Sequence, residues 1–183
     1  MRNIINWIFL ICIAAPFAAA QQTKKEITRP PNPAEDTRPN SSAVPDAYAI
    51  STQFQRVVLL RFKYNTDLLA GLERMVKEQG IKNAVVLAGM GSVRNYQVHA
   101  VANRGFPSTD LFVRDPTAPA DIIGMNGYIL NGRVHAHVTL SIGDRAFGGH
   151  LEPDTNVFTF VIVTVGVLNS DADFSRLDDQ TFR

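Results

Sequence analysis

The chain has 183 residues, of which 45% are hydrophobic and 19% are charged, and its formal net charge is +1. This length is enough for one domain with a single apolar core. A nearly neutral chain without clustered Lys and Arg lacks the charges that bind phosphate backbones, so the composition argues against nucleic acid as a partner.

The first twenty residues have the pattern of a secretory signal peptide. Arg2 gives a positive start, residues 7–15 are an apolar run, and residues 18–20 are three alanines. The apolar run is short compared with the roughly 20 residues of a membrane span. We therefore expect cleavage after Ala20, export to the periplasm or the medium, and no membrane anchor afterwards.

Cleavage changes the composition in two ways. Cys12, the one cysteine of the chain, lies inside the segment, so the mature protein has no cysteine. This excludes disulfides, Cys-ligated zinc and thiol catalysis. Loss of Arg2 also lowers the 18 basic side chains to 17, which equals the number of acidic ones.

Residues 21–45 predict a disordered linker, and residues 46–183 predict one folded domain. The linker combines prolines with charged and small polar residues and has few large apolar ones. Such a segment cannot bury enough surface to offset the entropy lost on ordering, so we expect it to be extended and mobile.

The first half of the domain predicts a strand, a helix and three further strands. Residues 55–63 form a largely apolar strand, and the helix follows, with residues 65–67 as its cap and Gly80 as its stop signal. Its apolar stripe has helical spacing; it comprises Leu68, Leu69, Leu72, Met75 and Val76. We expect strands over 83–93, 94–101 and 121–130, and a loop over 103–120, where prolines limit regular structure.

Residues 132–152, GRVHAHVTLSIGDRAFGGHLE, predict a β-hairpin that carries three histidines. Period-2 alternation and the turn pair Gly143-Asp144 place residues opposite each other when their numbers sum to 287. His137 then lies opposite His150, while His135 shares the same face, and Glu152 follows on the same side of its strand. By contrast, we expect His99 to be an ordinary exposed strand histidine.

The last strand, residues 156–168, is apolar on both faces. Such a strand must be covered on both sides, either by the domain's own elements or by another subunit. Many antiparallel strands with one firm helix give an α+β fold class. We therefore expect a mainly antiparallel sheet in a protein that self-associates.

The order of GMGSVRN (89–95), IIGMNGYI (122–129), GRVHAHVTLSIGDRAFGGHL (132–151) and FSRLDDQTF (174–182) resembles the PPC family, also called DUF296. The resemblance runs from about residue 55 to the end. It implies a compact α+β domain, usually a homotrimer, in a family that includes plant DNA-binding proteins. Two features depart from the family: Phe160 stands where we would align a glutamate, and the turn between His137 and His150 is shorter than usual.

The HxH…GGH arrangement is also similar to that of α-acetolactate decarboxylase, in which three such histidines bind zinc. This resemblance implies His135, His137 and His150 as ligands of zinc or another divalent transition metal. Neutral imidazole suits Zn²⁺, and three protein ligands with an open position are typical of catalytic sites. Glu152 is our candidate catalytic acid/base, with a fourth metal ligand or a solvated carboxylate as alternatives.

Two classes of function remain open. The first is a metal-dependent protein that binds, or acts on, a small anionic molecule; as an enzyme it would be a lyase or hydrolase. Arg133 and Arg145 could hold such an anion, or they could simply flank the turns. The second is a metal-free binding or assembly module, with DNA binding as in other members of the resembled family. Export and neutral charge argue against DNA.

Overall fold

The computed structural model describes residues 26–28, 40–169 and 172–183, so the predicted signal peptide lies outside the described residues. In chain order the elements are β1 (Glu26–Thr28), β2 (Phe54–Lys63), α1 (Leu68–Glu78), β3 (Ala84–Val93), β4 (Tyr96–Val101), β5 (Asp110–Asp115), β6 (Ala120–Leu130), β7 (Arg133–Ile142), β8 (Arg145–Leu151) and β9 (Val157–Leu168). The α+β prediction, one helix with a mainly antiparallel sheet, is confirmed.

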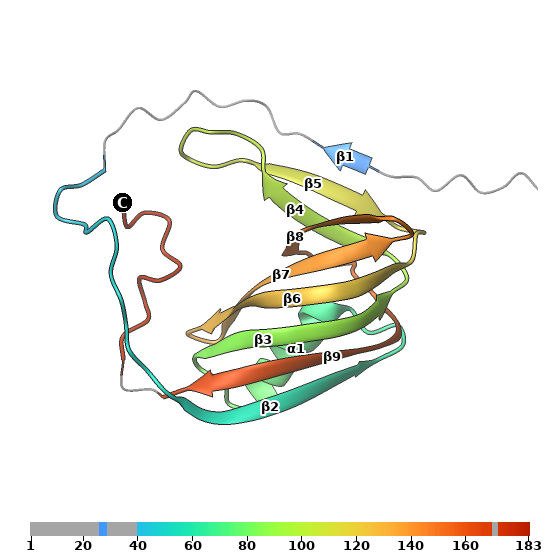
Figure 1. Cartoon of the computed structure of the whole chain (residues 1–183), viewed down its shortest axis with the longest axis horizontal. Coiled ribbons are helices and arrows are strands. Elements are labelled where there is room, and N and C mark those ends of the chain that lie inside the picture. The colour runs from blue at the N-terminus through green and yellow to red at the C-terminus, as the bar shows by residue number, and fades with distance from the viewer. Residues whose placement is uncertain (1–25, 29–39, 170–171) are drawn as a thin grey trace, which may run out of the picture.

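The described strands form one sheet in the order β1-β5-β4-β8-β7-β6-β3-β9-β2, and every neighbouring pair is antiparallel. The sheet is strongly twisted, and α1 lies behind β3 and β9 (Figure 1). Twist of this kind follows from the right-handed preference of each strand. Among the described residues, no helix has the length and apolarity that crossing a membrane requires.

Helix α1 begins and ends where the sequence predicts. Asp67 is its N-cap, and its side chain accepts a hydrogen bond from the backbone N–H of Ala70 at 3.0 Å. Gly80 follows the helix with a φ of 62°, a left-handed conformation that glycine adopts at little cost. The apolar stripe is buried at Leu68, Leu72 and Val76, which pack into the same core as the sheet.

The core lies on the sheet face that α1 covers. On β9 the valines at 157, 161, 163 and 165 are fully buried. The opposite face, which we call the outer face, is less covered: Phe158 is 46% exposed, and Phe160 and Ile162 are only partly buried. The two apolar faces predicted for this strand therefore differ in burial, because the single helix covers only one of them.

Two segments differ from the predicted pattern. Residues 103–120 contain β5, which pairs with β4 along its whole length. Prolines at 107, 116 and 119 lie outside this strand, so they bound it without interrupting its hydrogen bonds. Within the predicted linker, Glu26–Thr28 forms the short exposed edge strand β1 against β5.

Candidate metal centre

The chain's four histidines come together on the outer face of the sheet. We call His99, His135, His137 and His150 the histidine cluster. On β7, Val134, Ala136 and Val138 are buried in the core, and strand alternation turns the intervening His135 and His137 to the other side. The same alternation that builds the core therefore presents the imidazoles outside it.

The predicted hairpin register is confirmed. His137 pairs with His150 across β7 and β8, and the pairing continues without a bulge to Ile142 and Arg145 at the turn. The ring centroid of His150 lies 4.9 Å from that of His135 and 5.6 Å from that of His137. The three histidines predicted as ligands are thus immediate neighbours.

The prediction for His99 was wrong. β4 lies beside β8, and His99 pairs directly with His150. The side chain of His99 is only 22% exposed, and its Nδ1 lies 2.6 Å from Oε1 of Glu152. Alternation along β4 correctly predicted the sheet face on which His99 lies. No local pattern in the sequence predicts that β8 is the neighbour of β4.

Glu152 joins two of the histidines. Its Oε1 lies 2.6 Å from Nδ1 of His99 and 3.0 Å from Nδ1 of His150, and its side chain is 18% exposed. An ionised carboxylate can only accept hydrogen bonds, so both imidazoles carry a proton on Nδ1 and leave Nε2 as the acceptor or ligand nitrogen. Of the roles considered for Glu152, a freely solvated carboxylate does not fit this geometry.

A second carboxylate, which the sequence reasoning missed, contacts the cluster from the C-terminal segment. Oδ1 of Asp178 lies 2.9 Å from Nδ1 of His135, and Oδ2 accepts a hydrogen bond from the guanidinium of Arg133. The segment 172–183 has no strand or helix periodicity that could have located it. The only signal was its DD pair within the motif FSRLDDQTF.

The two histidines of β7 face each other through their Nε2 atoms. Nε2 of His135 lies 3.3 Å from Nε2 of His137, and the rings are nearly parallel, with an interplanar angle of 22°. Two nitrogens that each lie 2.0–2.1 Å from a tetrahedral zinc ion are about 3.3 Å apart. The spacing of this pair therefore suits two ligands of one ion.

Burial and mutual repulsion favour the neutral form of two histidines in the cluster. Burial lowers the pKa of His150 below its usual 6.5, with neighbouring His99 adding to the effect and Glu152 opposing it. The pKa of His137 is also lowered, first by burial and then by His135 and His150. Neutral imidazole is the form that binds metal ions, so the site favours the protonation state that a ligand needs.

A second set of possible ligand atoms overlaps the predicted one. Three possible ligand atoms, one from each of His99, His150 and Glu152, lie within 4.8 Å of one another. His150 belongs both to this set and to the predicted set of His135, His137 and His150. Among the described residues, His99, His150 and Glu152 are the group whose ligand atoms meet this spacing and could hold a metal ion, and His150 is the residue that this group shares with the predicted set.

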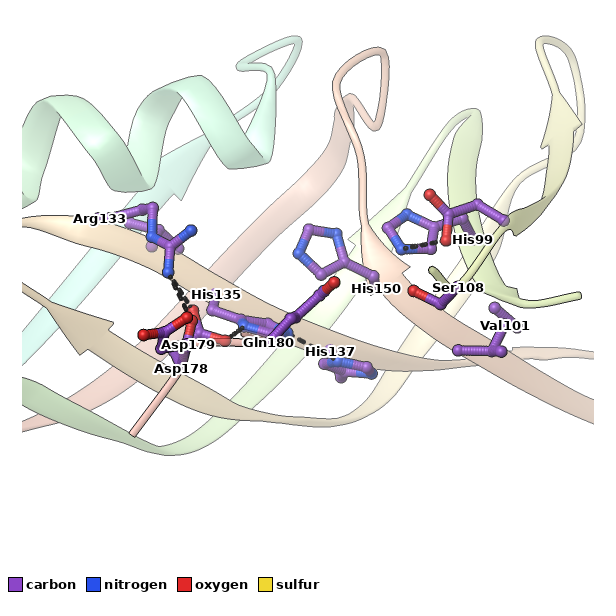
Figure 2. A pocket seen from close by; sticks show the side chains of 13 residues that line it. His99, Val101, Ser108, Arg133, His135, His137, His150, Asp178, Asp179 and Gln180 are labelled. Carbon is purple, nitrogen blue, oxygen red and sulfur yellow. Dashed lines mark hydrogen bonds and ion pairs between the residues drawn. The ribbon is translucent and has the colours of Figure 1, made fainter. Parts of the chain in front are cut away.

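The cluster opens into a cavity of about 610 Å³. Figure 2 shows Arg133, Asp178 and His135 at one end of this cavity and His99 with Ser108 at the other. A second, more apolar cavity of about 400 Å³ reaches His135 and His137 from the side of Tyr128 and Leu177. Small molecules can thus approach the imidazoles from solvent.

Comparison with known proteins identifies the family. Residues 49–169 match the model of the Plants and Prokaryotes Conserved (PCC) domain, the family resembled by the histidine motifs. The chain belongs to this family. No curated protein matches the chain at a significant level.

Solved structures share the fold. A metal-containing protein from Archaeoglobus fulgidus is 24% identical with a TM-score of 0.58, and the match covers 67% of this chain and 86% of that one. A plant- and prokaryote-conserved (PPC) protein from Pyrococcus horikoshii is 23% identical with a TM-score of 0.56, covering 68% and 87%. A protein from Bacteroides thetaiotaomicron, described as a candidate DNA-binding protein, is 18% identical with a TM-score of 0.51, covering 63% and 83%.

Proposed function

We propose that this domain binds one divalent transition metal ion, zinc by preference, through His135, His137 and His150. The observation that carries the proposal is the 3.3 Å separation of the two Nε2 atoms of His135 and His137, which matches two ligands of a tetrahedral ion. His150 supplies the third nitrogen, because its Nδ1 donates to Glu152 and its Nε2 is left to bind. The name of the Archaeoglobus relative as a metal-containing protein supports this proposal.

The alternative set of His99, His150 and Glu152 is less favoured. Both nitrogens of His99 already face carboxylates, since its Nδ1 meets Glu152 and its Nε2 lies 3.7 Å from Oδ1 of Asp110. Glu152 also bonds both imidazoles through the same oxygen, as an orienting carboxylate does in many metal sites. We therefore assign His99 and Glu152 to the support of the site.

Metal content measured by mass spectrometry tests the ligand set. Wild type offered zinc and then dialysed should retain one ion per chain, while His150→Ala and His135→Ala should lose it. His99→Ala should cost less affinity than either. Thr139→Ala, on the same face of β7 two residues beyond His137, is the matched control and should bind as wild type does. Equal losses at His99 and His150 with none at His135 would instead favour the alternative set.

We propose that the ligand of the metal-bearing cavity is a small anion. Arg133 lines the cavity next to His135, and its guanidinium side chain is 67% exposed. A guanidinium can bind a carboxylate or phosphate through paired N–H groups. Arg145, the other candidate, lies at the β7–β8 turn and does not line this cavity. If the bound anion reacts, Glu152 is our candidate for the acid or base of that reaction.

We also propose that the protein is exported and that it self-associates through the outer face. Leu59, Met90 and Ile123 are 71%, 57% and 60% exposed there, and large apolar side chains gathered on one exposed face favour an interaction surface. A trimer is the assembly that the family resemblance implies. The apolar strands β2, β9 and β3 lie on the half of the sheet away from β4, β8 and β7, so a partner can pack there without filling the histidine cavity.

DNA binding is the second candidate, because the Bacteroides relative is described in those terms. The equal numbers of acidic and basic side chains in the predicted mature chain speak against it, since phosphate binding depends on clustered positive charge. Fluorescence anisotropy with a labelled duplex at low salt checks this alternative. Saturable binding that weakens steeply with added salt would favour it over a small-molecule role.

A further inference from the structure

We propose that Asp178 is a positioning residue of the metal site: its carboxylate holds His135 in the tautomer and orientation that present Nε2 to the ion. This inference rests on the proposed metal-binding function. It assigns a role to a side chain of the C-terminal segment, which follows the residues 49–169 that the family model matches.

The hydrogen-bond geometry fixes the direction of the contact. Oδ1 of Asp178 lies 2.9 Å from Nδ1 of His135, and a carboxylate can only accept, so His135 must carry its proton on Nδ1. Its Nε2 is then unprotonated, and in the metal-free protein this atom accepts the hydrogen bond that Nε2 of His137 donates at 3.3 Å. Carboxylates that accept from the second nitrogen of a metal-binding histidine set its tautomer and raise its basicity in this way.

The C-terminal segment is tied down on both sides of Asp178. Before it, Phe174 is 4% exposed and packs with Leu130 and Leu168 in a small separate core. After it, the ring of Phe182 meets that of Tyr48 edge-on, with centroids 5.9 Å apart. Because these contacts hold the backbone, the carboxylate is placed at His135 by packing as well as by its own hydrogen bonds.

Arg133 fixes the other oxygen of the same carboxylate. Its guanidinium donates to Oδ2 and also to the backbone carbonyl of Asp178. The Asp178 side chain, at 22% exposure, is shielded more than Arg133 at 67%. With one oxygen bound to Arg133 and the other to His135, the carboxylate has one orientation, and that orientation determines the plane of the imidazole.

Asp178→Ala and Asp179→Ala form a matched pair of variants. Each removes one carboxylate from the cavity lining, but among the described residues the Asp179 carboxylate accepts hydrogen bonds only from Thr181. We expect Asp178→Ala to bind zinc about 10–100-fold more weakly, the usual cost of removing such a partner. Asp179→Ala should match wild type. The measurement is competition with a chromophoric zinc chelator, and thermal unfolding of both variants in EDTA verifies that the fold survives.

Two further variants distinguish the loss of His135 positioning from a change in the charge near the ion. Asp178→Ala also releases the positive charge of Arg133 near the ion, so the double variant Asp178→Ala/Arg133→Met is needed. If positioning is the cause, the affinity loss persists in the double variant; full recovery would overturn the inference. Asp178→Asn keeps an oxygen that can accept from Nδ1–H, and it should retain part of the affinity lost in the alanine variant.

Long-range ¹H–¹⁵N NMR of the metal-free protein reads the tautomer directly. The chain has four histidines, so single His→Ala variants assign their signals. His135 should be protonated on Nδ1 in wild type and should shift toward mixed tautomers in Asp178→Ala; a proton on Nε2 in wild type would overturn the inference. If wild type binds no zinc, the proposed function fails. If wild type and Asp178→Ala bind zinc equally, the function stands and only the role of Asp178 fails.

Discussion

His99 and His150 lie directly opposite each other on β4 and β8, and their rings stack with centroids 4.6 Å apart and an interplanar angle of 22°. One oxygen of Glu152 accepts from Nδ1 of both rings. The three side chains therefore form one unit, in which the carboxylate sets the orientation of two imidazoles at once. A substitution of Glu152 should therefore change the orientation and tautomer of His150 even though the backbone of β8 is unaltered.

We expect Glu152→Ala to weaken zinc binding about 10–100-fold, because His150 loses the acceptor that fixes its tautomer. Glu152→Gln retains an oxygen that can accept hydrogen bonds but lacks the negative charge of the carboxylate, so its loss of affinity should be smaller. Zinc competition assays on both variants check this. A glutamine variant as weak as the alanine variant would indicate that Glu152 itself is a ligand, since an amide oxygen replaces a carboxylate poorly in that role.

The metal-free protein should become less stable as the pH falls below about 6.5. Burial lowers the pKa values of His137 and His150 in the folded state below their usual 6.5. Between the folded and unfolded pKa values the unfolded chain binds more protons, so the free energy of unfolding decreases as the pH falls and levels off below the folded pKa values. Urea unfolding in EDTA between pH 7.5 and 5 measures this slope.

The double variant His137→Gln/His150→Gln is the control for that slope. It removes the two shifted groups, so its free energy of unfolding should depend less on pH over the same interval. A wild-type slope that is unchanged in the double variant would assign the effect to other groups.

Zinc binding should persist at pH 6.5 and weaken only at lower pH. Protons compete with the metal for the imidazole nitrogens, and the lowered pKa values of His137 and His150 make the protons weaker competitors. Isothermal titration at pH 7.5, 6.5 and 5.5 should show a small loss in the first interval and a larger one in the second. A loss concentrated above pH 6.5 would contradict the shifts.

If the wild type forms the proposed trimer, Leu59→Glu should convert it to a smaller species. Leu59 is 71% exposed on the outer face of β2, and a carboxylate there would have to be desolvated in an interface. Light scattering at micromolar concentration should give three times the mature mass for wild type and one for the variant. Lys77→Glu, on the solvent side of α1, is the control and should leave the mass unchanged. A monomeric wild type would refute the self-association.

Protein recovered from the envelope or medium of the producing cell should begin at Gln21. The positive start, the short apolar run and the alanines at 18–20 predict cleavage after Ala20. Intact-mass measurement reads the N-terminus directly. A cytoplasmic product that retains Met1 would contradict export.

The sequence by itself determined the elements whose signals are local. The cap at Asp67 and the stop at Gly80 placed α1 correctly, because both act on backbone groups a few residues away. The turn at Gly143 set the register that brings His137 opposite His150, since a two-residue turn fixes the pairing of the strands on either side of it. Local signals were therefore enough to group three of the four histidines.

Only the tertiary structure decided which distant elements meet. Strand alternation gave the face of His99 but could not state that β4 lies beside β8, because pairing between strands far apart in the sequence depends on the whole sheet. Asp178 reaches His135 from a segment without periodicity, held in place by the burial of Phe174. On β9 both faces are apolar, and the face on the side of α1 became the core while Phe158 on the other face stayed exposed.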